Sequence, residues 1–351
     1  MAIPHLVSDC QGGVMLMTSK NMAPVAEEIA RSLQHQGVPI EYTEKCVVDV
    51  KVFSDGELCP DVQPNVRDKV VFLFWDFTPT DFVGHINVRK EELFLTLDAL
   101  KRAKVRSVNL IAPYLPYSRQ DRRMRGKPLS AKILAEGLEA HGCIDQLVTF
   151  DLHAPQITGF YDTIHVENIP AHVMFAHYFR KHFAEAIAND SLRIMSTDVG
   201  GSKRARDCAE YIDPGMDISI VDKRRDALGS KAMKLVGDVS DIMIAYDDIG
   251  GTMGSMLDAC TMALNAGAKE IYGAITHNVC SPTKDSSAEK KIADAGIKIF
   301  TLDTLPRGDA YYKKNPLIVR VSYTEFMAEA IIEMISVDGS LSNLIRAWSQ
   351  K

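Results

Sequence analysis

Short apolar runs alternate with amphipathic segments along nearly the whole chain. The runs at 70–75 (VVFLFW) and 107–114 (SVNLIAPY) flank a segment at 90–104 whose leucines recur at helical spacing. This segment begins with acidic residues and ends with basic ones, which suits the dipole of a helix. The pattern therefore predicts a strand, a helix and a second strand parallel to the first.

The same alternation continues to the far end of the chain. A helix at 131–142 that stops at Gly142 precedes a strand at 146–153, and an amphipathic helix begins at 173. The second half is predicted to hold strands at 192–198, 217–222, 241–248 and 270–277, and helices that begin at Lys203 and Ser255. Alternating strands and helices predict an α/β fold with mostly parallel sheets flanked by helices.

The chain length predicts about two such domains. At 351 residues, 46% hydrophobic and 25% charged, the chain has enough apolar material for two cores. We expect an N-terminal domain at 1–164 and a C-terminal domain at 165–321, with a C-terminal helix at 322–351 that packs back on the first.

Charge and cysteine content restrict the function and the compartment. A formal net charge of -6 and a pI near 5.9 argue against a nucleic-acid partner. The seven cysteines are scattered singly, without zinc-ligand spacing, which is typical of reduced thiols in the cytosol. No apolar run approaches the length of a membrane span, and we expect a cytoplasmic protein with no membrane partner.

The segment 242–255 (IMIAYDDIGGTMGS) carries the clearest chemistry. An apolar strand runs into Asp247 and Asp248 and then into a glycine-rich loop that opens a helix. Carboxylates at the end of a strand accept hydrogen bonds from sugar hydroxyls, and backbone N–H groups at a helix N-terminus face an anion. The pattern indicates a phosphorylated ribose, although aspartates that merely cap the helix give the same sequence.

Polar residues also follow the strands of the first half. Arg119, Gln120 and Arg122 belong to a basic run after the strand at 107–114, and guanidinium groups bind phosphate oxygens in pairs. The run predicts a polyphosphate clamp, or alternatively a solvated basic surface. His153 follows the next strand and is a candidate for binding magnesium or a phosphate, or for a structural role.

In the second half, a carboxylate and a basic segment occupy the equivalent positions. Asp198 ends a strand beside a glycine turn, and Asp222 leads directly into Lys223, Arg224 and Arg225. A basic loop of this kind is able to close on an anionic substrate and supply charge in the transition state. The alternative is a solvated basic turn.

These segments together resemble one family, the ribose-phosphate pyrophosphokinases, also called phosphoribosyl pyrophosphate synthetases. The resemblance extends from about residue 15 to residue 346, and the motifs occur in the family's order. The matching motifs are FSDGE at 53–57, PYxxYSRQDRR with KPLSAKILA, DLHAPQITGFYD, TDVGGxxRAR, VDKRR, GDV at 237–239, the DD loop and MAEAIIEMISVDGSLSNLI near the end of the chain.

The resemblance implies an enzyme that transfers the β,γ-diphosphoryl group of ATP, with Mg²⁺, to the 1-hydroxyl of ribose 5-phosphate. The products are phosphoribosyl pyrophosphate (PRPP) and AMP. It also implies two type I phosphoribosyltransferase-like domains and a homo-oligomer, from a dimer to a hexamer. The roles implied for the ATP side are adenine contacts from a neighbouring subunit for Phe53, Asp55 and Glu57, and ATP binding for Arg119, Gln120 and Arg122. Magnesium binding is implied for His153 and Asp198, and binding of the ribose or its 5-phosphate for Asp198, Asp247, Asp248, Thr252, Gly254 and Ser255. The implied catalytic residues are His153 and the two charge-stabilising residues Lys223 and Arg225.

Two segments depart from the family pattern. Where members read DDMxDTAGT, this chain reads DDIGGTMGS, so that Gly251 replaces an acid and Met253 replaces an alanine. We expect the Met253 side chain to change the shape of the acceptor pocket beside the 5-phosphate. The segment 75–93 differs from the family's QSxxxPxNDxLMEL, which affects the subunit contacts and the regulatory phosphate site.

These departures leave rival functions open. The first is an ordinary PRPP synthetase, and the second is the same chemistry on another 5-substituted ribose such as ADP-ribose. A non-catalytic regulatory subunit is disfavoured because His153, Asp198, Lys223 and Arg225 are retained. A phosphoribosyltransferase acting on a base would leave the ATP clamp without a role.

Overall fold

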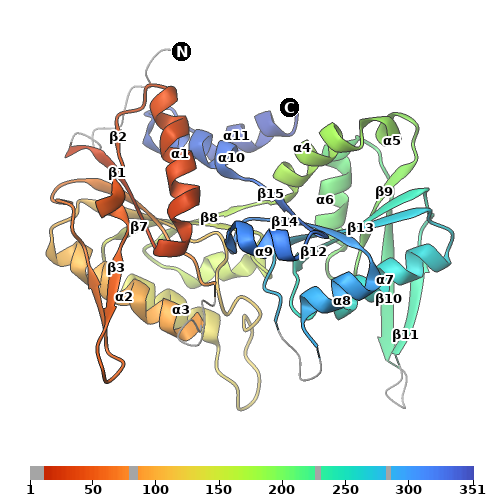
Figure 1. Cartoon of the computed structure of the whole chain (residues 1–351), viewed down its shortest axis with the longest axis horizontal. Coiled ribbons are helices and arrows are strands. Elements are labelled where there is room, and N and C mark those ends of the chain that lie inside the picture. Colours follow the sequence, from red (N-terminus) through yellow and green to blue (C-terminus); the bar gives the residue numbers. More distant parts are fainter. Residues whose placement is uncertain (1–11, 79–85, 226–230, 282–285) are drawn as a thin grey trace. The chain divides into compact units, whose positions relative to one another are not determined.

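The computed structural model describes residues 12–78, 86–225, 231–281 and 286–351, and at 224–225 and 231–232 it describes the backbone alone. Its contacts divide the chain into two compact units (Figure 1). Unit 1 comprises Met1–Ile169, Thr304–Pro306 and Thr324–Leu344; unit 2 comprises Pro170–Asp303, Arg307–Tyr323 and Ile345–Lys351. The division after Ile169 lies near the domain boundary expected at 164, and the assignment of domains at 1–164 and 165–321 stays a prediction.

Unit 1 is built on a six-stranded parallel sheet in the order β2-β1-β5-β6-β7-β8. Its strands are β1 (Val14–Thr18), β2 (Ile40–Glu41), β5 (Val70–Phe74), β6 (Ser107–Ile111), β7 (Ile144–Phe150) and β8 (His165–Ile169). Strands β1 and β5 are buried along their whole length, which explains their continuous apolar sequences, because helices cover both faces of a parallel sheet.

Helices and 3-10 turns lie between the strands of unit 1 along the chain. They are η2 (Lys20–Met22), α1 (Ala23–His35), η3 (Glu44–Cys46), α2 (Ile86–Arg102), α3 (Ser130–Glu139) and η4 (Pro155–Phe160). Strands β3 (Asp49–Val52) and β4 (Leu58–Asp61) form a separate antiparallel hairpin.

The C-terminal segment forms two helices and not the single helix predicted at 322–351. Helix α10 (Thr324–Ile335) packs against α1, and the Thr324 hydroxyl donates to Glu28 at 2.9 Å. A turn separates α10 from α11 (Leu341–Trp348). A Cβ at Gly339 would lie 1.7 Å from the carbonyl oxygen of Glu333, so the chain turns back there too closely for any other residue.

A buried ionic cluster lies where the segment 75–93 departs from the family pattern. The Asp76 carboxylate, 1% exposed, accepts hydrogen bonds from Ser19 Oγ at 2.7 Å, Asn21 Nδ2 at 3.2 Å and Arg89 Nη2 at 2.9 Å. Arg89 also pairs with Glu92 on α2. Burial raises the pKa of Glu92, and the neighbouring guanidinium opposes that shift. One buried cation therefore holds two buried carboxylates.

Unit 2 is built on a seven-stranded sheet in the order β11-β10-β9-β12-β13-β14-β15. All neighbouring strands are parallel except β10 and β11, which are antiparallel. The strands are β9 (Leu192–Ser196), β10 (Ile218–Arg225), β11 (Lys231–Val236), β12 (Ile242–Ile249), β13 (Glu270–His277), β14 (Lys298–Leu302) and β15 (Ile318–Val321). The helices are α4 (His172–His182), α5 (Ala184–Ala188), α6 (Ser202–Ile212), α7 (Gly254–Asn265), α8 (Ala288–Ala295) and α9 (Gly308–Lys314).

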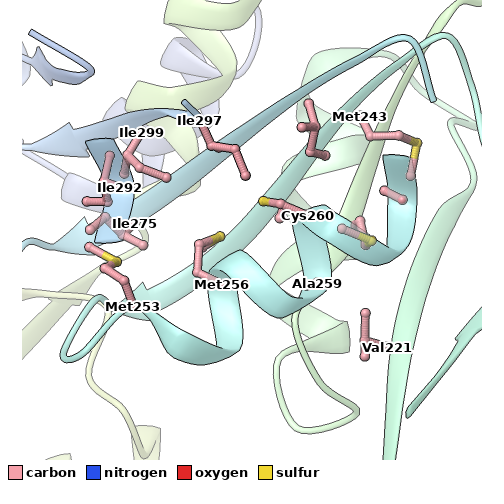
Figure 2. Packing of buried hydrophobic residues seen from close by; sticks show 14 of the residues in the cluster. Val221, Met243, Met253, Met256, Ala259, Cys260, Ile275, Ile292, Ile297 and Ile299 are labelled. Carbon is pink, nitrogen blue, oxygen red and sulfur yellow. The ribbon is translucent and has the colours of Figure 1, made fainter. Parts of the chain in front are cut away.

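Helices cover both faces of this sheet. Figure 2 shows the face on which α7 lies, where Met256 and Cys260 pack against Ile275 and Ile299. On the other face, the rings of Phe175 in α4 and Tyr246 in β12 lie 5.4 Å apart. The α/β class predicted from the sequence is thus confirmed. In the described part of the chain, no helix is both long and apolar enough to cross a membrane.

Strand β10 corrects the prediction of a basic loop after Asp222. The strand continues to Arg225, and Lys223 lies opposite Met233 of β11. The buried Val221 anchors the strand, and backbone pairing with β11 carries it past the polar residues. Lys223 is half-buried on this strand. The side chain of Arg225 and residues 226–230 lie outside the described part of the chain.

Candidate active site

The paired aspartates lie at the carboxyl end of β12, as the sequence predicts. Strand β12 runs parallel to β9, with Tyr246 opposite Ser196, so the residues that follow β9 lie beside the aspartates. Thr197 Oγ1 donates a hydrogen bond to Asp247 Oδ2 at 2.6 Å. The two carboxylates are therefore held at the edge of the sheet where ligands bind in open parallel folds.

Arg204 on α6 contacts both carboxylates. Its Nη1 lies 3.4 Å from Asp248 Oδ1 and 3.9 Å from Asp247 Oδ1. Burial raises the pKa of Asp247 to about 7, and the adjacent Asp248 charge adds to the shift, whereas Thr197 and Arg204 oppose it. The oxygen atoms of both carboxyl groups accept hydrogen bonds, so the pair suits the hydroxyls of a ligand.

The raised pKa of Asp247 has a consequence for stability. The folded state binds more protons than the unfolded state between about pH 4 and the folded pKa of about 7, so stability falls as pH rises through this window. We expect Asp247→Asn to raise the unfolding free energy of the ligand-free protein by about 2 kcal/mol at pH 8, with the gain disappearing near pH 4.

Denaturant unfolding at several pH values measures this effect. The control is Asp258→Asn, which removes an exposed carboxylate from α7. A gain for Asp247→Asn that is the same at pH 4 and pH 8 would contradict the proposed electrostatic origin.

The loop at 250–255 is pinned to the segment that follows β13. The Gly250 amide donates to His277 O, and the amides of Cys280 and Ser281 donate to the carbonyls of Gly250 and Gly251, all at 2.9 to 3.0 Å. Helix α7 begins after the loop, and Thr252 and Ser255 are exposed beside its first turn. The N–H groups of a first helical turn lack intrahelical partners, so this end of α7 suits a phosphate.

Met253 does not line the open face of this loop, contrary to the expectation from the sequence. Its backbone is left-handed, with φ of 61°, and its side chain is only 3% exposed. Figure 2 shows Met253 beside Ile275 in the core cluster. A Cβ at Gly250 would lie 2.4 Å from both of these side chains. The left-handed backbone turns Met253 into the core, and the side chain forms the floor of the loop.

Asp198 is half-exposed at the end of β9, before α6. Its Oδ1 accepts the Gly201 amide at 2.9 Å, and Ser196 Oγ donates to its carbonyl oxygen at 2.7 Å. These bonds fix the carboxylate while Oδ2 stays available as a ligand. Among the described residues, no group of three His, Cys, Asp or Glu side chains gathers as a metal site.

In unit 1, the predicted ATP-binding residues follow β6. The Gln120 amide donates to Tyr117 O at 2.7 Å, and Gln120 Oε1 accepts Ser130 Oγ at 2.6 Å. Arg119 and Arg122 are exposed on either side of this fixed turn. His153 follows the neighbouring strand β7 and is also exposed. Unit 1 therefore presents cations and an imidazole at the carboxyl edge of its own sheet.

The FSDGE motif forms the tip of the β3–β4 hairpin. The Phe53 amide donates to Glu57 O at 2.8 Å, and Asp55 Oδ1 accepts the Glu57 amide at 3.2 Å. Phe53 is 42% exposed, and the Lys51 ammonium lies 4.7 Å from its ring centre. An exposed aromatic ring on a rigid turn is suited to contact a ligand or another chain.

Sequence reasoning missed three residues that contact this site. Thr197 and Arg204 lie within the TDVGGxxRAR motif, and their positions after β9 and on α6 bring them to Asp247. The third is Lys291 on α8, whose ammonium reaches the loop at 250–255. No local pattern pointed to Lys291, since its helix is separated from the loop by a whole strand and its connections.

A mostly parallel sheet with paired carboxylates and a glycine-rich helix start at its carboxyl edge defines the class of α/β proteins that bind their ligands at the ends of the strands. Residues 14–142 match a profile described as the N-terminal domain of ribose phosphate pyrophosphokinase. The ribose-phosphate pyrophosphokinase of Campylobacter jejuni is 38% identical over 288 residues, which is 80% of this chain and 85% of that protein. That of Bacillus caldolyticus is 34% identical over 93% of this chain and 96% of its own length.

The fold has a counterpart among solved structures. The crystal structure of phosphoribosylpyrophosphate synthetase from Mycobacterium smegmatis superposes with a TM-score of 0.76 and 26% identity, over 92% of this chain and 98% of that chain. The chain belongs to the ribose-phosphate pyrophosphokinase family, and it is an enzyme. The predicted fold of two phosphoribosyltransferase-like domains agrees with this match.

Proposed function

We propose that this enzyme transfers the β,γ-diphosphoryl group of ATP to the 1-hydroxyl of ribose 5-phosphate and releases PRPP and AMP. One observation carries the proposal: Asp247 and Asp248, held by Thr197 and Arg204, directly precede a loop that opens helix α7. This segment offers acceptors for two sugar hydroxyls and donors for one phosphate. The family membership supports the same chemistry.

The acceptor side uses unit 2. The carboxylates of Asp247 and Asp248 accept hydrogen bonds from the ribose hydroxyls and orient the ring. The hydroxyls of Thr252 and Ser255 and the amides from Gly254 onward bind the 5-phosphate. Because the loop is tied to the segment after β13, these groups are in place before the substrate arrives, which lowers the entropy cost of orientation.

The ATP side uses unit 1. Arg119, Gln120 and Arg122 bind the nucleotide, and His153 contacts its phosphates. By the resemblance, Phe53, Asp55 and Glu57 would contact adenine from a neighbouring subunit, and the exposed ring at the hairpin tip is consistent with that role. The proposal thus includes a homo-oligomer, from a dimer to a hexamer.

Charge stabilisation completes the mechanism. Lys223 and Arg225 neutralise the charge that develops on the migrating diphosphoryl group. Asp198 and His153 would hold magnesium, which supplies charge neutralisation on the phosphate oxygens when bound. A single fixed carboxylate with a free oxygen fits that ion, because Mg²⁺ in such sites takes few protein ligands and binds mainly through water and substrate phosphates.

The choice of acceptor is tested by incubating the enzyme with ATP and magnesium and measuring the release of AMP. Ribose 5-phosphate is compared with ADP-ribose, the alternative acceptor suggested by the altered loop at 247–255. We expect kcat/KM to be at least about tenfold higher for ribose 5-phosphate. The reason is that the Met253 side chain lies in the core and does not reach the exposed side of the loop, where Thr252 and Ser255 lie. Faster turnover of ADP-ribose would contradict the proposal, and no AMP release with either acceptor would favour a regulatory subunit.

A further inference from the structure

A lysine of helix α8 lies against the loop at 250–255. The Lys291 Nζ is 3.4 Å from the carbonyl oxygen of Thr252. The position of α8 is fixed, because Ser287 Oγ accepts the Lys290 amide at 3.1 Å and Ile292 is buried in the core at 1% exposure. The ammonium is therefore delivered to one side of the loop by a helix anchored at its start and on its inner face.

The neighbouring lysine differs in its partner. Lys290 Nζ pairs with Asp294 at 2.8 Å on the exposed side of α8. Within the described ranges, no carboxylate oxygen lies within 4.0 Å of the Lys291 ammonium. Its contact with a neutral carbonyl at 3.4 Å is long for a charge-assisted hydrogen bond, so little energy is lost when the ammonium turns to a better acceptor.

The groups around the loop at 250–255 indicate what the Lys291 ammonium could bind. Asp247 and Asp248 are the carboxyl groups of the acceptor site, and Arg204 contacts both of them. The donors that the described part of the 250–255 loop itself offers to an acceptor phosphate are neutral: the hydroxyls of Thr252 and Ser255 and the backbone amides at the start of α7. A phosphomonoester carries nearly two negative charges at pH 7, and a lysine binds it as a strong point charge.

We propose that Lys291 is a further acceptor-binding residue, whose ammonium binds the phosphomonoester at the 5-position of the ribose substrate beside the N-terminus of α7. The inference rests on the proposed function and adds the cation of that site. It also defines the substrate class more narrowly: the site takes a terminal phosphate with two ionisable oxygens, because one side of the phosphate faces an ammonium and the other faces the helix.

The test compares Lys291→Met with the matched variant Lys290→Met, which removes the same charge from the adjacent position. We expect Lys291→Met to raise the KM for ribose 5-phosphate and its calorimetric Kd about tenfold to a hundredfold, which is the usual effect of losing one hydrogen bond to a charged group. The kcat and the KM for ATP should change less than about threefold. Lys290→Met should match the wild type, and Lys291→Arg should recover most of the affinity.

The outcomes separate this inference from the proposed function. If the wild type releases AMP with ribose 5-phosphate but Lys291→Met keeps the wild-type KM and Kd, the role of Lys291 is wrong and the function stands. An equal loss in Lys290→Met, or an equal rise in the KM for ATP, also overturns the role. A wild type that does not use ribose 5-phosphate refutes the function itself. Should Lys291→Met unfold, Lys291→Gln keeps the polar chain and serves the same comparison.

Discussion

Replacing Lys223 by alanine is expected to lower kcat by about 10²–10³, with the KM for ATP changing less than about threefold. A cation that acts on the charge of the migrating diphosphoryl group stabilises the transition state more than the bound substrates. Because Lys223 lies on the regular strand β10, removal of its side chain leaves the backbone pairing with β11 intact. Arg225→Ala is expected to lower kcat similarly. Steady-state kinetics with both substrates varied measures the effect.

The matched control for this prediction is Lys234→Ala. Lys234 is an exposed lysine of the same hairpin, on β11 opposite Asp222. It should leave kcat within about twofold, since it has no proposed role in the reaction. If Lys223→Ala changes only the KM for ATP, the lysine binds the ground state, and its assigned role in the transition state is wrong.

Replacing Arg89 by methionine is expected to destabilise the protein by about 3–5 kcal/mol. Arg89 is the cation between Asp76 and Glu92, and its side chain is 9% exposed. Removing it leaves two carboxylates close together in a buried place without a compensating charge. Methionine keeps the length of the side chain, so the loss reports electrostatics more than packing. Urea unfolding at pH 7 measures it.

A variant on the same helix provides the comparison. Arg102 on α2 pairs with Asp98 at 2.6 Å, but its side chain is 79% exposed. Arg102→Met should leave the unfolding midpoint nearly unchanged, because exposed ion pairs contribute little. If Arg89→Met and Arg102→Met destabilise the protein equally, the loss in Arg89→Met does not come from the burial of its two carboxylates.

Much of the fold follows from local patterns. The strand predicted at 270–277 matches β13, because an apolar run bounded by polar residues has one simple solution in a parallel sheet. The predicted strand at 217–222 ends three residues before β10 does, because the following KRR has no strand pattern of its own. Its extension depends on hydrogen bonds to β11 across the hairpin. The sequence predicts one C-terminal helix where the structure has two. The turn between them depends on the close approach of Gly339 to Glu333, which a one-dimensional pattern does not reveal.

The candidate site divides in the same way. Asp247, Asp248 and the glycine-rich loop could be predicted because they follow one strand directly in sequence. Arg204 and Lys291 reach that loop from other helices, so only the assembled fold brings them there. The expectation that Met253 shapes the acceptor pocket takes no account of its burial. The burial depends on a left-handed backbone, which is unusual for a residue with a side chain and is not visible in the sequence.

The floor of the 250–255 loop limits how substrate preference changes in evolution. Since Met253 and Ile275 belong to the hydrophobic core, deepening the loop for a bulkier sugar would open a cavity in the core and cost about 2–5 kcal/mol. Exposed positions such as Thr252 and Ser255 carry no such penalty. Substitutions that adapt the site to a new acceptor are thus expected at the exposed positions of the loop, where they cost little folding stability. Met253 and Ile275 beneath the loop are retained because the core needs them.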